Sequence, residues 1–121
     1  MDIIIELPDF DKFYVLNNTI LELTLQLESL KLHLEKTEAD TVAKVFSDVK
    51  TYNVNGKQPS MEYVKNTWKV TGIGEVNLMD LRKAVYEAQA KLDCAKREYE
   101  ILKITVETWR TQSANERSSF S

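Results

Sequence analysis

Hydrophobic residues recur with a seven-residue period in the first third of the chain. Between residues 16 and 34 they follow alternating steps of four and three, the heptad pattern of a helix that packs along another helix. This first seam consists of Leu16, Ile20, Leu23, Leu27, Leu30 and Leu34. Asp9 and Asp11 follow Pro8, and either carboxylate can cap the free amides of a first helical turn. The pattern predicts a long helix over residues 10–50.

A second apolar stripe follows a neighbouring face of the same helix. Its members are Leu21, Leu25, Leu32, Ala39, Val42, Phe46 and Val49. One stripe can be covered by a second helix of the same chain, whereas the other needs a further helix. Another copy of the chain is the simplest source of that helix. The sequence therefore predicts an all-α protein that assembles into a homo-oligomer.

The second long helix is predicted over residues 77–112. Asn77 offers an N-cap oxygen, and Asp80 places a negative charge in the first turn, where the helix dipole favours it. The apolar seam then runs through Leu78, Leu81, Val85, Ala88, Leu92, Ala95, Tyr99, Leu102, Val106 and Trp109. Two helices of about 35–40 residues would each be about 50–60 Å long, so we expect an elongated helical hairpin or bundle. The serine-rich residues 113–121 are predicted to form a frayed tail.

The segment between the two long helices, residues 51–76, has a different character. Asn55 and Gly56 form a turn dipeptide, and Pro59 precedes the expected start of a short helix that ends at Gly72. One face of this short helix carries Met61, Val64 and Trp68. A β-hairpin around the turn is the alternative, and Pro59 opposes it because proline lacks a ladder donor. Residues 1–9 are expected to be an N-terminal arm, either a short strand or a segment that packs on a neighbouring subunit.

Composition favours one soluble helical domain spanning residues 1–121. The 121 residues are 43% hydrophobic, which supports a modest core. The single cysteine, Cys94, cannot form an internal disulfide, so a reducing cytoplasm is the expected location. Together with the single histidine, His33, it leaves too few soft ligands for a zinc site. The longest apolar run near the start, residues 3–5, is too short for a membrane span.

Catalytic chemistry has little support in the sequence. The carboxylates occur at positions typical of solvated helix faces, and no spacing marks a pair for acid–base catalysis. His33 lies outside the first seam and is expected to be a partly exposed or interfacial histidine, because no partner residue marks it as a catalytic base. Cys94 precedes the seam residue Ala95 and is interpreted as a small packing residue. We therefore expect a protein that is not an enzyme, with no catalytic residue, no metal and no cofactor.

Charge is unevenly distributed along the chain, whose formal net charge is −3. Residues 1–43 carry a net charge of −6, residues 44–69 a net charge of +3, and residues 70–121 are balanced. A local basic patch can follow a phosphate backbone even on an acidic protein, because affinity depends on the phosphates neutralised at the contact.

The basic segment also contains aromatic rings, which is typical of single-stranded nucleic-acid binding. Such sites combine cations along the phosphates with rings on which bases stack, each stacked base contributing about 1–3 kcal/mol. The candidate nucleic-acid-binding residues are Lys50, Tyr52, Lys57, Tyr63, Lys65 and Lys69. Trp68 shares a face with Met61 and Val64, so we expect it to hold the short helix onto the bundle.

The order of these features resembles the phage recombination mediators of the UvsY type. The resemblance covers residues 15–112 in layout, and most of its character comes from Ser60-Met61-Glu62-Tyr63 and the following Lys65, Trp68 and Lys69. It implies a ring-like homo-oligomer that binds single-stranded DNA without sequence preference in a phage-infected cell. It also implies two protein partners in DNA recombination and repair, a RecA-like recombinase and a single-strand-binding protein. By this resemblance the lysines would contact phosphates, and Tyr52 and Tyr63 would be the stacking rings.

A structural or chaperone-like coiled-coil assembly without a nucleic-acid ligand is the alternative function. Prefoldin-type chaperone subunits are also helical hairpins with a small element between the helices, although the insert here is richer in lysine and more helical. In this alternative, Tyr63 and Trp68 close the end of the bundle.

Overall fold

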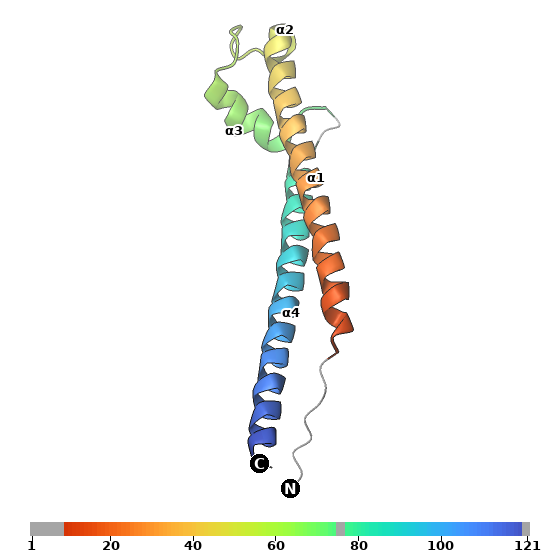
Figure 1. Ribbon diagram of the computed structural model, residues 1–121. Helices are drawn as coiled ribbons and strands as arrows, with labels where there is room; N and C mark the ends of the chain where they lie inside the picture. The colour runs from red at the N-terminus through yellow and green to blue at the C-terminus, as the bar shows by residue number, and fades with distance from the viewer. Residues whose placement is uncertain (1–8, 75–76, 120–121) are drawn as a thin grey trace. The chain divides into compact units, whose positions relative to one another are not determined.

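The computed structural model describes residues 9–74 and 77–119, with side chains to residue 117. Four helices follow one another along the chain (Figure 1): α1 (Asp11–Ser47), α2 (Val49–Tyr52), α3 (Met61–Thr71) and α4 (Leu78–Ser119). No β-strand occurs among the described residues. The predicted all-α class is therefore confirmed, and so is the order of long helix, insert and long helix. The predicted N-terminal arm, residues 1–9, lies outside the described residues apart from Asp9.

Contacts within the chain form two compact units. Unit 1 comprises the described parts of Met1–Thr24 and Ala90–Ser121, and unit 2 comprises Leu25–Gln89. In each unit a segment of α1 packs against an antiparallel segment of α4, as their opposite colour gradients in Figure 1 show. The predicted pairing of the two long helices is thus confirmed.

Unit 1 is held together by the two heptad seams. The α4 residues Leu92, Ala95 and Val106 are buried. Two aromatic pairs join α4 to the start of α1, Phe13 with Tyr99 at 5.3 Å between ring centroids and Phe10 with Trp109 at 6.0 Å, and both pairs are edge-to-face. Edge-to-face pairs of this kind each contribute about 0.5–1.5 kcal/mol beyond the area they bury. The seam spacing predicted the α4 positions correctly, whereas Phe10 and Phe13 precede the predicted seam of α1 and were missed.

Helix α1 begins as predicted and ends earlier than predicted. The Asp9 carboxylate caps it by accepting a hydrogen bond from the Asp11 amide at 3.1 Å. It stops at Ser47, whereas the sequence pattern suggested continuation to residue 50. The cause is Asp48, which leaves the helical conformation (φ −125°, ψ 64°) and accepts a hydrogen bond from the Thr51 amide at 3.2 Å. A side-chain cap of this kind starts a new turn, α2, at the expense of the continuous helix.

Helix α4 also begins at its predicted cap. The Asn77 side-chain oxygen accepts a hydrogen bond from the Asp80 amide at 3.1 Å. The helix then continues to Ser119, through most of the segment 113–121 that the sequence suggested was a frayed tail. Neither glycine nor proline occurs after Gly74, so nothing in the sequence breaks the helix. Arg117 adds a hydrogen bond from its Nε to the Ser113 carbonyl at 3.3 Å.

Helix α3 has defined ends and a buried face in unit 2. The Ser60 hydroxyl accepts a hydrogen bond from the Tyr63 amide at 3.1 Å, which caps the first turn. Gly72 ends the helix with φ 82°, a left-handed conformation that favours glycine, and its amide donates to the Trp68 carbonyl at 2.7 Å. The buried cluster below α3 consists of Val45, Val64 and Ile73, with Val42, Phe46, Tyr52 and Trp68 packed around it.

This packing changes the interpretation of the second apolar stripe of α1. Val42 and Phe46, near the C-terminal end of the stripe, pack against the α3 cluster of the same chain. Leu21, Leu25 and Leu32 remain exposed, with accessible fractions of 58%, 63% and 65%. Part of the stripe that the sequence assigned to another copy of the chain is therefore covered from within. The four-residue and seven-residue spacings alone do not distinguish these two kinds of partner.

The loop between α2 and α3 combines features of both sequence interpretations. Asn55 and Gly56 have positive φ values of 53° and 80°, as the turn dipeptide predicted. Val54 and Lys57 form an isolated antiparallel bridge across the turn, with backbone hydrogen bonds of 2.8 and 3.1 Å. The bridge does not extend into strands, because α2 ends one residue before Asn53 and Pro59 follows closely.

Candidate nucleic-acid interface

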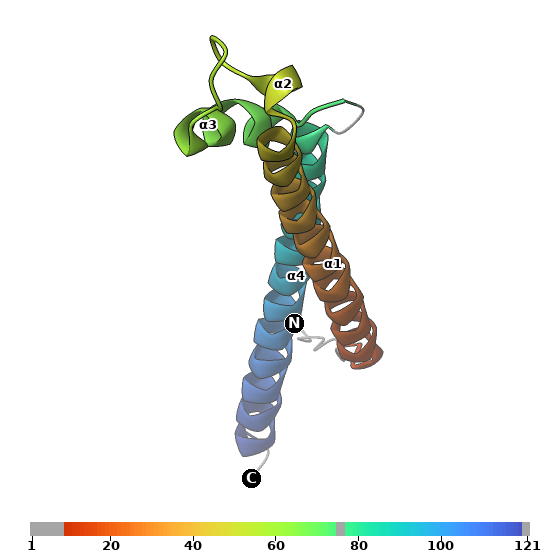
Figure 2. The ribbon, with the colours of Figure 1, turned by 90° about the horizontal axis from the view of Figure 1, so that it is seen from above.

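Three of the predicted phosphate-binding lysines have exposed side chains. Lys50 lies on α2, Lys57 in the turn and Lys65 on α3. These three elements lie around the C-terminal end of α1, and Figure 2 shows α2 and α3 together at that end. Tyr63 on α3 is 39% exposed, so part of its ring is available to a ligand. We call Lys50, Lys57, Tyr63 and Lys65 together the basic insert surface, in which Tyr63 and Lys65 lie two residues apart on α3 and point to different sides of that helix.

Tyr52, the other predicted stacking ring, is less accessible than the residues of the basic insert surface. Its ring is half-buried and lies edge-to-face against Trp68, with centroids 5.6 Å apart and planes at 73°. Stacking of a base needs an accessible ring face, and this ring is partly occupied by packing. Of the two predicted stacking rings, Tyr63 is therefore the more accessible.

Lys69 is paired with an acidic side chain. Its Nζ lies 3.4 Å from Glu38 Oε2, and the Glu38 side chain is only 17% exposed. The carboxylate offsets the positive charge that a phosphate would otherwise meet. Lys69 thus differs from the three exposed lysines, although the sequence placed all four in one group.

Arg82 completes a network around Glu38 that the sequence did not reveal. Its Nη2 donates to Glu38 Oε1 at 2.9 Å and to the Lys69 carbonyl at 2.7 Å, while Nη1 lies 3.4 Å from the Val70 carbonyl. The guanidinium therefore satisfies carbonyls at the C-terminal end of α3, where a positive charge also suits the helix dipole. Glu38, Lys69 and Arg82 come from α1, α3 and α4, respectively. Because they are far apart in the sequence, no local pattern indicates that they meet.

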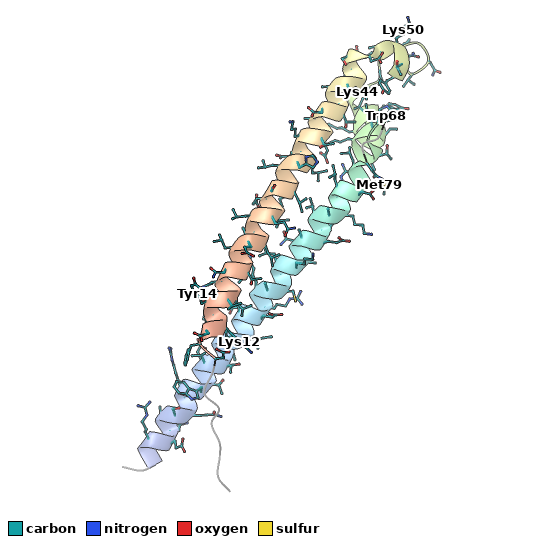
Figure 3. The ribbon with its side chains drawn as sticks, turned by 90° about the vertical axis from the view of Figure 1, so that its right-hand side faces the viewer. Lys12, Tyr14, Lys44, Lys50, Trp68 and Met79 are labelled. Atoms are coloured by element: carbon teal, nitrogen blue, oxygen red, sulfur yellow. The ribbon has the colours of Figure 1, made fainter. Side chains whose placement is uncertain are left out.

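Trp68 performs the packing role that the sequence predicted. It is half-buried against the cluster of Val45, Val64 and Ile73, and Figure 3 labels it on α3 together with Lys50 on α2. Its indole Nε1 is buried, and no hydrogen-bond acceptor for it occurs among the described residues. The contribution of Trp68 to stability therefore comes from its apolar surface.

An open groove lies between α1 and α3 within unit 2. Its volume is about 420 Å³. The lining residues are Glu35, Glu38, Ala39, Val42, Ala43, Met61, Lys65 and Lys69. The floor is apolar, and the two rims carry opposite charges, glutamate on α1 and lysine on α3. We call this feature the α1–α3 groove.

Other candidate groups do not form a site. His33 is exposed, as expected, whereas Cys94 is also exposed and does not pack as the sequence suggested. Cys94 precedes the buried Ala95, and one step of about 100° around the helix is enough to turn it away from the seam. No group of three or more metal-binding side chains occurs in the part of the chain that the structure describes. Within the same part, none of the helices contains an apolar stretch of the length that a membrane span requires.

The fold and the surface together define a class, an all-α protein built on two long antiparallel helices with a basic insert between them. Comparison of the sequence and structure with protein-family models, curated proteins and solved structures finds no match.

Proposed function

We propose that this protein is a non-enzymatic homo-oligomer that binds single-stranded DNA and assists a RecA-like recombinase. The observation that carries the proposal is the basic insert surface, in which three exposed lysines accompany the accessible ring of Tyr63. Cations that follow phosphates and a ring on which a base stacks are the two parts of a site without sequence preference.

The proposed DNA contact uses fewer residues than the sequence suggested. Lys69 is paired with Glu38, and Tyr52 packs against Trp68, so both serve the fold of the insert. Three lysines neutralise few phosphates, and binding by a single chain would be weak. Several copies of the surface on one oligomer would bind a long strand much more tightly, because each later contact is intramolecular.

The role in recombination follows from the resemblance to UvsY-type mediators. A protein that holds single-stranded DNA through backbone and stacking contacts leaves the sequence of the strand unread, as loading of a recombinase requires. The partners proposed on this basis are the recombinase itself and a single-strand-binding protein that occupies the same DNA.

Fluorescence anisotropy with a labelled oligothymidine tests the DNA contact. We expect the wild-type protein to bind at low salt, and the variant with Lys50→Glu, Lys57→Glu and Lys65→Glu to bind at least about tenfold more weakly. The expected loss follows from three phosphate contacts that are replaced by repulsion.

The matched control carries three charge reversals on α4, at Lys83, Lys91 and Lys96. These side chains are also exposed, so the control has the same net charge as the insert variant. It is expected to keep most of the wild-type affinity. Equal loss in both variants would mean that total charge, and not the basic insert surface, governs binding, and absence of binding by the wild type would refute the proposal.

A structural or chaperone-like assembly remains a second candidate, and one observation favours it. Tyr52, Trp68 and Lys69, which make the insert distinctive in the sequence, are all engaged in packing or ion pairing. In that case the insert would serve the fold alone. The same anisotropy experiment separates the two functions, because this candidate predicts no binding of the oligonucleotide.

A further inference from the structure

Helix α1 presents a line of apolar residues that the fold leaves uncovered in unit 2. Leu25 and Leu32 lie seven residues apart on one face and are 63% and 65% exposed. Seven residues further along the same face, the exposed Ala39 forms part of the floor of the α1–α3 groove. The line therefore begins with two large side chains and ends with a small one beside a hollow.

Two copies of this line of residues are complementary in shape when the helices that carry them pack antiparallel. If two such helices pack antiparallel about a two-fold axis at Leu32, Leu25 of each copy lies opposite Ala39 of the other. A leucine side chain then meets an alanine at the edge of the α1–α3 groove, whose volume is about 420 Å³. Met61, which is 50% exposed on the α3 side of the groove, offers further apolar contact. Large side chains that pack against small ones give interdigitated interfaces without voids.

The charges that flank the line also match in this register. The same axis places Glu28 opposite Lys36 and Glu35 opposite Ser29 of the second copy, so each interface contains two opposite-charge pairs and no like-charge pair among these residues. Within its own chain Glu28 makes an exposed ion pair with Lys31 at 3.6 Å, which is weak enough to exchange for another partner. A parallel arrangement in register would place Glu28, Glu35 and Lys36 against their own copies.

We propose that the face of α1 around Leu25, Leu32 and Ala39 is the contact through which a second copy of this chain binds, antiparallel and with its two-fold axis at Leu32. The contact is isologous, because the same patch serves both copies. The inference rests on the homo-oligomer of the proposed function and specifies which surface forms one of its interfaces. Lys65 belongs both to the basic insert surface and to the rim of the α1–α3 groove, so the contact is tested without DNA.

Sedimentation velocity of the full chain over a range of concentrations tests the contact. The wild type is expected to associate, and Leu32→Asp, which brings two carboxylates together on the axis, is expected to raise the dissociation constant at least about tenfold. Ile101→Asp is the matched control, because Ile101 is as exposed as Leu32, at 64%, and belongs to α4 and not to the α1 face of the proposed contact. It should associate like the wild type. Circular dichroism of both variants checks that their helices remain folded.

A charge exchange tests the antiparallel register. Glu28→Lys alone should weaken association because it faces Lys36, and Glu28→Lys combined with Lys36→Glu should restore it. In a parallel arrangement the double variant would still oppose like charges and would gain nothing. Failure of the double variant to recover would therefore overturn the register.

Disulfide trapping in a chain that carries Cys94→Ser gives an independent result. Leu32→Cys is expected to cross-link two copies under oxidation, Leu25→Cys alone is not, and Leu25→Cys with Ala39→Cys is. A cross-link through Leu25→Cys alone would indicate a parallel contact and contradict the proposal.

The outcomes separate this inference from the proposed function. A wild type that oligomerises while Leu32→Asp has no effect overturns the interface alone. A wild type that stays monomeric at every concentration overturns both the interface and the oligomer, whereas DNA binding is measured separately. If this face of α1 bound only a different protein and not a second copy of the chain, that result would also overturn the inference.

Discussion

Trp68 shows how one side chain can serve packing at the expense of a hydrogen bond. Its ring contacts Tyr52 and the buried cluster of Val45, Val64 and Ile73. Its Nε1 is buried without an acceptor among the described residues. A buried N–H group that makes no hydrogen bond destabilises the folded state, because the same group donates to water in the unfolded chain. The favourable contribution of Trp68 to stability therefore comes from the apolar area that it buries.

Two substitutions at Trp68 separate these terms. Trp68→Ala should lower the free energy of unfolding by about 2–3 kcal/mol, slightly below the range for a fully buried tryptophan because Trp68 is half-buried. Trp68→Phe keeps a ring and removes the unpaired donor, so it should cost less than about 1.5 kcal/mol. Urea unfolding followed by circular dichroism measures both. A phenylalanine variant as unstable as the alanine variant would show that the indole N–H has a partner, such as a bound water.

Helix α3 depends on other elements for its position. An isolated helix of 11 residues is marginal in water, and α3 has a single fully buried residue, Val64. Arg82 of α4 adds hydrogen bonds to the last carbonyls of α3, and Glu38 of α1 holds Arg82 at 2.9 Å. The insert is thus positioned by a network that joins three helices.

Arg82→Ala tests this view of α3. It removes charge-assisted hydrogen bonds and leaves Glu38 with one partner, so it should lower the free energy of unfolding by about 1.5–3 kcal/mol. Amide hydrogen exchange should accelerate most in α3, where the carbonyls of Lys69 and Val70 lose their donor. Lys83→Ala at the next position is the control, since Lys83 makes one exposed ion pair at 4.0 Å and should change stability by less than about 0.5 kcal/mol. Equal effects of both substitutions would argue against the network.

At the scale of the whole molecule, charge is segregated along the chain. The protein is acidic overall, with a formal net charge of −3, and yet the insert presents three exposed lysines. Long-range repulsion by the acidic remainder is screened within about 8 Å at physiological salt, whereas direct phosphate contacts persist. The proposed DNA binding should therefore be strongly dependent on salt.

The salt dependence gives a quantitative prediction. Each phosphate contact to a single strand contributes a slope of about −0.7 to the logarithm of affinity against the logarithm of salt concentration. Replacing Lys50, Lys57 and Lys65 by glutamine should make the slope less steep by about 2 for each chain that contacts the DNA. Anisotropy titrations between low and moderate salt measure the slope. An unchanged slope would mean that these lysines do not contact phosphates.

The sequence predicted the elements that depend on neighbouring residues. Heptad spacing identified the seams of α1 and α4, the Asp9 and Asn77 caps were correct, and Gly72 ended α3 where a left-handed residue was needed. Each of these features is decided within one or two helical turns. Asp48 was missed because its side chain competes with the helix through a local hydrogen bond that the apolar pattern does not register.

Only the tertiary structure distinguished the lysines of the insert from one another. Composition groups Lys69 with Lys50, Lys57 and Lys65, but α1 brings Glu38 to Lys69, and α4 brings Arg82 to the same carboxylate. The same holds for the second stripe of α1, which α3 covers at Val42 and leaves open at Leu25 and Leu32. The sequence determines the elements because helix formation and capping are local. Which charge is neutralised and which apolar face stays open depend on contacts between residues far apart in the chain.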